Sequence, residues 1–165
     1  MSSQTYGFPR IRSSRTWGEA AASGLIAGAG MGLIMHFVMG AMPLIGALYG
    51  QPTVAAGWLA HLFHSVVFAL VFAAVLTRPT FREYELYGIV GLGAVYGIIL
   101  ELVAAAFVLP VWANAVGAAE LPVPFLVPIG FLTHLVYGVL LGAVFGLLTM
   151  RERSRLVAPV KEADS

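Results

Sequence analysis

The residues of this sequence that could carry chemistry are four histidines and one glutamate that fall inside long apolar segments. They are His36, His61, His64, Glu101 and His134. A charged side chain at membrane depth costs about 2.5–3.5 kcal/mol, so ionisable residues found there commonly serve a function. Imidazole nitrogens and carboxylates are also ligands that zinc, iron, copper and nickel accept. The first question is therefore whether the chain brings these residues to one site.

Four apolar stretches are each long enough to cross a bilayer. They cover residues 19–42, 54–76, 86–109 and 126–149. Each is about 24 residues long, and about 20 residues span a hydrocarbon core. Charged residues make up only 10% of the chain, whereas about 25% is typical of soluble domains. The sequence therefore predicts an all-α membrane protein with four transmembrane helices, between tails at 1–18 and 150–165.

Basic residues give the expected orientation of these spans. All nine Lys and Arg precede the first span, lie between the second and third, or follow the fourth. The excess of Lys and Arg marks cytoplasmic loops, so both termini are predicted to be inside. The predicted location is the cell (plasma) membrane, crossed several times, with the lipid bilayer as partner. Because topology explains the basic groups, no nucleic-acid partner is expected.

Proline residues separate the predicted spans. Pro43 and Pro52 follow the first span, and Pro110 follows the third. Proline lacks a backbone N–H and its ring clashes with the preceding turn, so Pro110 is expected to end the third helix. Pro128 falls in the first turn of the fourth span, where the missing N–H costs little.

The four spans are predicted to form two copies of one helical hairpin. GLIMHFV at 32–38 aligns with GIILELV at 97–103, and GWLAHLFHS at 57–65 aligns with GFLTHLVYG at 130–138. The alignment pairs His36 with Glu101, His61 with His134, and His64 with Tyr137. Since ionisable positions match as well as apolar ones, the pattern favours a duplicated hairpin, repeated about an axis along the membrane normal.

A glycine lies one helical turn before each aligned ionisable position. These glycines are Gly32, Gly57, Gly97 and Gly130. Other small residues continue the same ridge at steps of four residues. Such ladders let membrane helices approach closely, so the glycines are predicted to be helix-packing residues. The histidines and the glutamate are then expected on the packed face, at a common depth in the outer half of the bundle.

A single site shared by all four helices would explain this pattern. The predicted ligands of a transition metal ion (Zn, Fe or Cu) are His36, His61, His134 and Glu101. His64 would be a further ligand or would support the ligands from behind, and Tyr137 is its counterpart in the other hairpin. Alternatively, two histidines could ligate haem b axially, and His61 and His134 are the symmetric pair for that role. The sequence has no cysteine, which excludes thiolate ligands. Close helix packing leaves little room for a porphyrin and favours a bare metal ion.

Two other functions fit the same residues. A His/Glu cluster could relay protons or pass a small solute, although the inner halves of the spans offer no continuous polar path. The cluster could also be a structural network of neutral imidazoles and a protonated Glu101 that fixes helix register. No motif requires catalysis. Glycine-rich helix faces exposed on the bundle would allow the protein to form a homo-oligomer or to be a subunit of a larger membrane complex.

Four spans with histidines inside them resemble a group of small membrane proteins of halophilic archaea and some bacteria. The resemblance covers residues 19–149 and is carried by the GxxxH turns. Proteins of that group are sometimes labelled histidine kinase. The present chain departs from a kinase, because it contains no ATP-binding domain and none of its histidines falls on a cytoplasmic helix. The resemblance implies a four-helix membrane protein and no particular activity.

Overall fold

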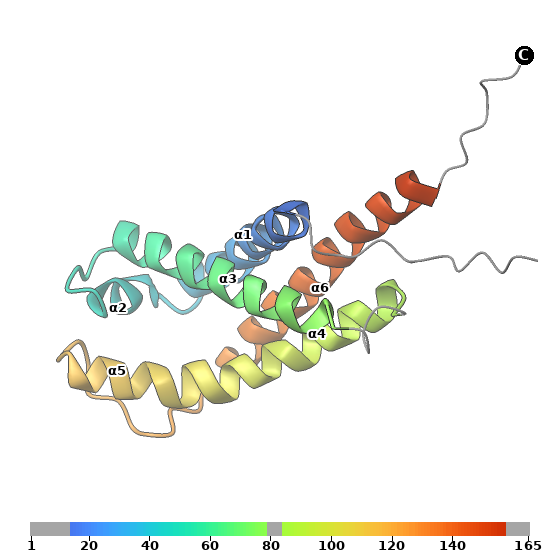
Figure 1. The fold of residues 1–165 in the computed structure, drawn as a ribbon. Coiled ribbons are helices and arrows are strands. Elements are labelled where there is room, and N and C mark those ends of the chain that lie inside the picture. The colour runs from blue at the N-terminus through green and yellow to red at the C-terminus, as the bar shows by residue number, and fades with distance from the viewer. Residues whose placement is uncertain (1–13, 79–83, 158–165) are drawn as a thin grey trace, which may run out of the picture.

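The computed structural model describes residues 14–78 and 84–157 (Figure 1). Every regular element within these ranges is a helix. The elements are α1 (Ser14–Phe37), α2 (Met42–Ala47), α3 (Val54–Leu76), α4 (Leu86–Leu100), η2 (Glu101–Val108), α5 (Leu109–Ala115) and α6 (Pro128–Val157). Four helical segments are long and apolar enough to cross a membrane, and α4, η2 and α5 together form the third of them. The prediction of an all-α protein with four transmembrane helices is confirmed.

The second span has the predicted bounds, but the first helix ends earlier than expected. Residues 54–76 form α3, whose first turn is capped by the Thr53 side chain. In contrast, α1 ends at Phe37 because the chain turns at Gly40, which has a positive φ of 62° that glycine adopts without strain. The short helix α2 then folds back against α3. A Cβ on Gly57 would collide with the backbone of Met42, so glycine is what permits this contact.

Pro110 does not end the third span, contrary to the prediction. The chain stays helical through η2, a π-helix, and Pro110 lies in the first turn of α5. Pro110 has no N–H to donate to the carbonyl of Ala106, one turn earlier. That carbonyl accepts a hydrogen bond from the N–H of Phe125 in the next loop, at 2.8 Å. The proline is tolerated because a loop supplies the donor that the helix lacks.

The helices form two close pairs, and one helix of each pair packs against one helix of the other. α1 packs against α3, α4 packs against α6, and α1 and α6 join the pairs at the centre (Figure 1). We call α1 to α3 hairpin one and α4 to α6 hairpin two. α3 and α4 make few backbone contacts with each other. The repeat that relates the two hairpins and the cytoplasmic side of the termini stay predictions.

Glycine backbones set the closeness of each pair. In hairpin two, a Cβ on Gly93 would collide with the carbonyl of Gly138, and the reverse also holds. Gly97 faces the carbonyl of His134 in the same way. In hairpin one, a Cβ on Gly24 would lie 2.8 Å from the carbonyl of Ser65. Membrane helices gain attraction from such backbone approach, since lipid tails are as apolar as their side chains.

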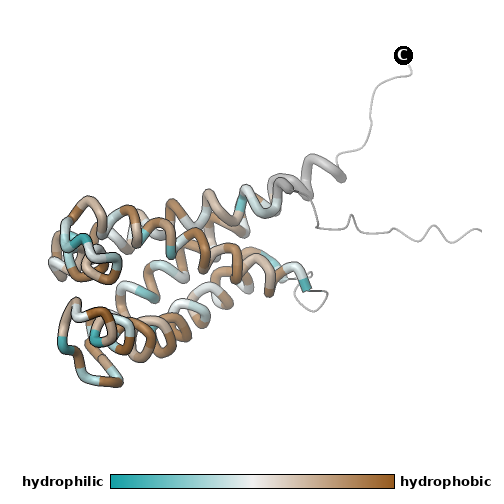
Figure 2. Tube along the Cα trace, turned by 60° about the vertical axis from the view of Figure 1, so that its left-hand side comes forward, coloured by the Kyte–Doolittle hydropathy of each residue, from teal (hydrophilic) through white to brown (hydrophobic). Residues whose placement is uncertain are grey.

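Most residues along the helices are apolar (Figure 2), and many large apolar side chains are exposed on the outside of the bundle. Leu59 and Phe63 on α3 are 74% and 62% exposed, and Val95 on α4 is 57% exposed. Apolar side chains exposed in such numbers are unfavourable in water and are covered by lipid tails in a bilayer. Together with the four long apolar helices, this surface identifies an integral membrane protein.

We expect the change Gly138→Ala to destabilise the protein by about 1–3 kcal/mol, because the added methyl group collides with the Gly93 carbonyl. The measurement is reversible unfolding in detergent. Gly91→Ala is the matched control, since a Cβ there meets no atom within 4 Å. Equal stability of the two variants would contradict the proposed role of glycine in hairpin two.

Candidate functional site

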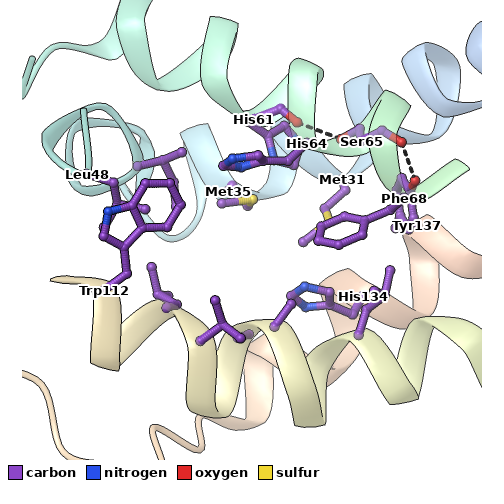
Figure 3. Close-up of a pocket in the computed structure, with 16 residues that line it drawn as sticks. Met31, Met35, Leu48, His61, His64, Ser65, Phe68, Trp112, His134 and Tyr137 are labelled. Atoms are coloured by element: carbon purple, nitrogen blue, oxygen red, sulfur yellow. Dashed lines mark hydrogen bonds between the residues drawn. The ribbon is translucent and has the colours of Figure 1, made fainter. Parts of the chain in front are cut away.

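A cavity of about 180 Å³ lies between α3 and the η2–α5 segment (Figure 3). We call it the interhairpin cavity, because its walls come from both hairpins. Its polar lining residues are His61, His64, Ser65, His134 and Tyr137. The remaining walls are apolar and include two methionines of α1 and Trp112 of α5. Three of the four histidines therefore face one space.

The cavity exists because the side chains that separate α3 from α4 change in size along the bundle. Toward the Leu76 end of α3, the ring centroid of Phe72 lies 5.3 Å from that of Tyr96 and 6.1 Å from that of Phe145. These rings fill the gap between the hairpins. Toward the α2 end, Ala104 and Ala105 of η2 face the gap instead. Their small side chains leave the space unfilled.

His61 is buried on α3 and its protonated ring nitrogen can be assigned. Nε2 lies 2.9 Å from the carbonyl oxygen of Gly28 on α1. A carbonyl oxygen only accepts hydrogen bonds, so Nε2 carries the proton. In the neutral imidazole, Nδ1 then keeps its lone pair. The same turn is tightened by the hydroxyl of Ser65, which donates to the carbonyl of His61 at 2.8 Å.

His134 on α6 is held by a carbonyl and by a carboxyl group. Its Nδ1 lies 3.0 Å from the carbonyl oxygen of Gly130 and 2.7 Å from Oε2 of Glu101. The Gly130 carbonyl oxygen only accepts hydrogen bonds, so Nδ1 carries the proton and the lone pair of the neutral ring lies on Nε2. Glu101 reaches this position because Gly130 has no side chain. A Cβ there would lie 2.6 Å from Oε1 of Glu101.

Glu101 is fully buried and poorly satisfied. The His134 N–H makes its hydrogen bond with the Gly130 carbonyl, and the proximity to Oε2 is a contact of poorer geometry. Neither carboxyl oxygen has a hydrogen-bond partner among the residues that the structure describes. A buried polar group without a hydrogen-bond partner is unfavourable for the free energy of folding. When a native protein keeps one, the group often belongs to a functional site or an ion-binding site. Glu101 also begins the π-helix η2, an element frequent at functional sites.

His64 closes the α2 end of the cavity with two aromatic residues. Its Nε2 lies 2.6 Å from the hydroxyl of Tyr49, which follows α2. The ring centroid of Trp112 on α5 lies 5.1 Å from that of Tyr49 and 6.0 Å from that of His64. The contact between Tyr49 and His64 could not be predicted from the sequence, because no periodic spacing relates a residue after α2 to one within α3.

Tyr137, the aligned counterpart of His64, joins the two hairpins. Its hydroxyl donates to the backbone carbonyl of Ser65 at 2.6 Å. The hydroxyl of Tyr96 makes a similar bond of 2.9 Å to the carbonyl of Phe68. Both acceptors lie on α3 and both donors lie on hairpin two. These bonds hold α3 in place across the gap where backbone contacts are few.

His36 lies apart from the cavity lining. Its ring centroid is 4.5 Å from that of Phe37 and 6.1 Å from that of Trp58. Over the described part of the chain, no three His, Asp or Glu side chains group closely enough to hold a metal ion. The structure thus brings His61, His64 and His134 around one space and places Glu101 beside His134. The four-ligand metal site stays a prediction.

Comparison of the chain with protein-family models, with curated proteins and with solved structures gives no match. The resemblance to small membrane proteins of halophilic archaea therefore stays a prediction. The four apolar helices identify an integral membrane protein. A finer function has to come from the residues of the interhairpin cavity.

We expect Tyr137→Phe to destabilise the protein by about 0.6–1.7 kcal/mol, the range measured for hydrogen bonds between membrane helices. The variant loses the bond to Ser65 but keeps the buried ring. Tyr87→Phe is the control, because the Tyr87 side chain is exposed. Unfolding in detergent measures both variants. A Tyr137→Phe protein as stable as the control would show that the bond does not tie the hairpins together.

Proposed function

We propose that this integral membrane protein binds a transition metal ion in the interhairpin cavity and serves in metal handling or sensing. The observation that carries the proposal is that His61, His64 and His134, from two helices, line one cavity. Imidazole is a ligand for zinc, copper, iron and nickel. With both termini on the cytoplasmic side, the cavity would lie in the outer half of the bundle, beneath the Tyr49–His64–Trp112 group.

The hydrogen bonds of two histidines support a ligand role. The carbonyl oxygens of Gly28 and Gly130 fix the protons of His61 and His134, as described above. Each neutral ring then has one nitrogen with a free lone pair. Metal-binding histidines commonly show this arrangement, in which the second nitrogen donates to a carbonyl or a carboxylate.

Glu101 supports the same proposal in a role that differs from the predicted one. As a neighbour of Nδ1 of His134, it would orient the imidazole and balance the charge of a cation on Nε2, without ligating the metal itself. A purely structural network would satisfy each of its polar members. The carboxyl oxygens of Glu101 lack hydrogen bonds within the described residues, and a nearby cation would offset that cost.

The size of the cavity favours a bare ion over haem. Its volume is about 180 Å³, close to the roughly 150 Å³ of an engineered cavity that accepts benzene. A porphyrin is several times larger than benzene. His61 and His134 would have to move apart, together with α3 and α6, before haem b could lie between them.

Metal analysis of the protein purified in mild detergent tests the proposal. We expect one bound metal ion per chain and no Soret band in the visible spectrum. His61→Ala combined with His134→Ala removes two ligands and should abolish binding. His36→Ala should keep it, because His36 packs on Trp58 and is outside the cavity lining. A folded native protein that binds no metal ion would contradict the proposal.

Glu101→Gln should weaken metal binding by about 10–100-fold, the range typical of groups that orient metal ligands. Glutamine keeps the size of the side chain and removes its charge. Competition with a metal chelator measures the affinity. Unfolding of the metal-free variant should show no loss of stability, which separates this role from a structural one. Glu85→Gln is the control, since the exposed Glu85 precedes α4 at the end remote from the cavity.

A further inference from the structure

Two methionines of α1 face the interhairpin cavity together with the histidines. Met31 and Met35 are four residues apart, so they lie on the same face of the helix in successive turns. They are only 6% and 7% exposed, and both line the cavity. The close-up shows the two side chains beside the histidines of α3, with His134 on the opposite wall (Figure 3). Their thioether groups border an unfilled space.

We propose that the ion bound in this cavity is monovalent copper, Cu(I), held by the thioethers of Met31 and Met35 together with the cavity histidines. This inference rests on the proposed metal-binding function. Thioether sulfur is a soft ligand that selects Cu(I), and imidazole also binds copper. The proposal adds two residues to the site and changes the expected metal from an unspecified transition ion to one oxidation state of copper.

The arrangement of the other ligands favours the same ion. Zinc sites are almost always tetrahedral, with thiolate, imidazole or carboxylate ligands. The sequence has no cysteine, and the described residues contain no group of three His, Asp or Glu side chains suited to a metal. An ion that accepts thioether sulfur can complete its coordination with Met31 and Met35. Zinc gains little from these two residues.

Charge balance gives an independent reason for a monovalent ion. The residues that line the cavity include no acid, and their imidazoles and thioethers are neutral ligands. Glu101, 2.7 Å from His134, is the acid adjacent to the site and supplies at most one negative charge. Uncompensated charge is unfavourable in a low-dielectric interior. One carboxylate balances Cu(I), whereas a divalent ion would leave one positive charge in the membrane.

Competitive titration of the full chain in detergent tests the inference. Cu(I) is added without oxygen in the presence of a coloured Cu(I) chelator, and Zn²⁺ is titrated separately against a zinc indicator. We expect Cu(I) to bind at least about 100-fold more tightly than Zn²⁺. Met31→Leu combined with Met35→Leu should weaken Cu(I) binding at least about tenfold and leave Zn²⁺ binding unchanged. Met39→Leu, outside the cavity lining, is the matched control.

The outcomes separate this inference from the proposed function. Zn²⁺ binding as tight as Cu(I) binding, or a double variant with native Cu(I) affinity, would overturn the copper assignment and leave a metal-binding protein. Binding of neither ion would overturn the copper assignment, and the absence of any metal ion in the purified protein would overturn the proposed function as well. If the double variant does not fold, X-ray absorption spectroscopy at the copper edge of the native Cu(I) complex tests whether sulfur atoms ligate the copper. Sulfur neighbours support the inference, and a shell of nitrogen and oxygen alone contradicts it.

Discussion

The close approach of helix backbones within each hairpin is the constraint on which the rest of this structure depends. Gly93 and Gly138 allow α4 and α6 to touch, and Gly24 does the same for α1 and α3. The two pairs then meet through α1 and α6, whereas α3 and α4 make few backbone contacts with each other. Large side chains must then bridge the remaining gap. Where Tyr96 and Phe72 do so, the bundle is filled.

The interhairpin cavity is the part of that gap that is left unbridged, and its polar groups are unusual for such a place. A membrane protein that only needed to fill space could have placed leucine there, as it does elsewhere. Instead, His61 and His134 face the cavity, each with one nitrogen engaged by a glycine carbonyl. The carboxyl group of Glu101 lies behind His134 without a hydrogen bond from the described residues. This combination of fixed imidazoles and an unsatisfied acid is the reason for proposing a cation site here and not a purely structural hydrogen-bonded network.

The sequence was sufficient to predict the four helices, but not the direction in which their ionisable side chains point; the common depth of these residues in the membrane stays a prediction. Depth follows from position along a helix at about 1.5 Å per residue. Direction depends on which helix becomes the neighbour, and spacing alone does not reveal that. His36 shares its aligned position with Glu101, yet it packs on Trp58 while Glu101 meets His134. The error at Pro110 has a similar origin, because the donor that rescues the Ala106 carbonyl comes from a distant loop residue, Phe125.

In the predicted alignment, the two hairpins carry different residues at the positions that lie next to the interhairpin cavity. In the alignment, Met31 and Met35 correspond to Tyr96 and Leu100. Hairpin two uses its tyrosine to reach across to Phe68, which closes the gap on that side. Hairpin one keeps flexible thioethers at the equivalent positions, beside the space that remains. The aligned positions of His36 and Glu101 also differ, because an imidazole in hairpin one corresponds to a carboxyl group in hairpin two. One hairpin thus offers soft neutral donors and the other a single charge, a division of roles that suits a soft monovalent cation.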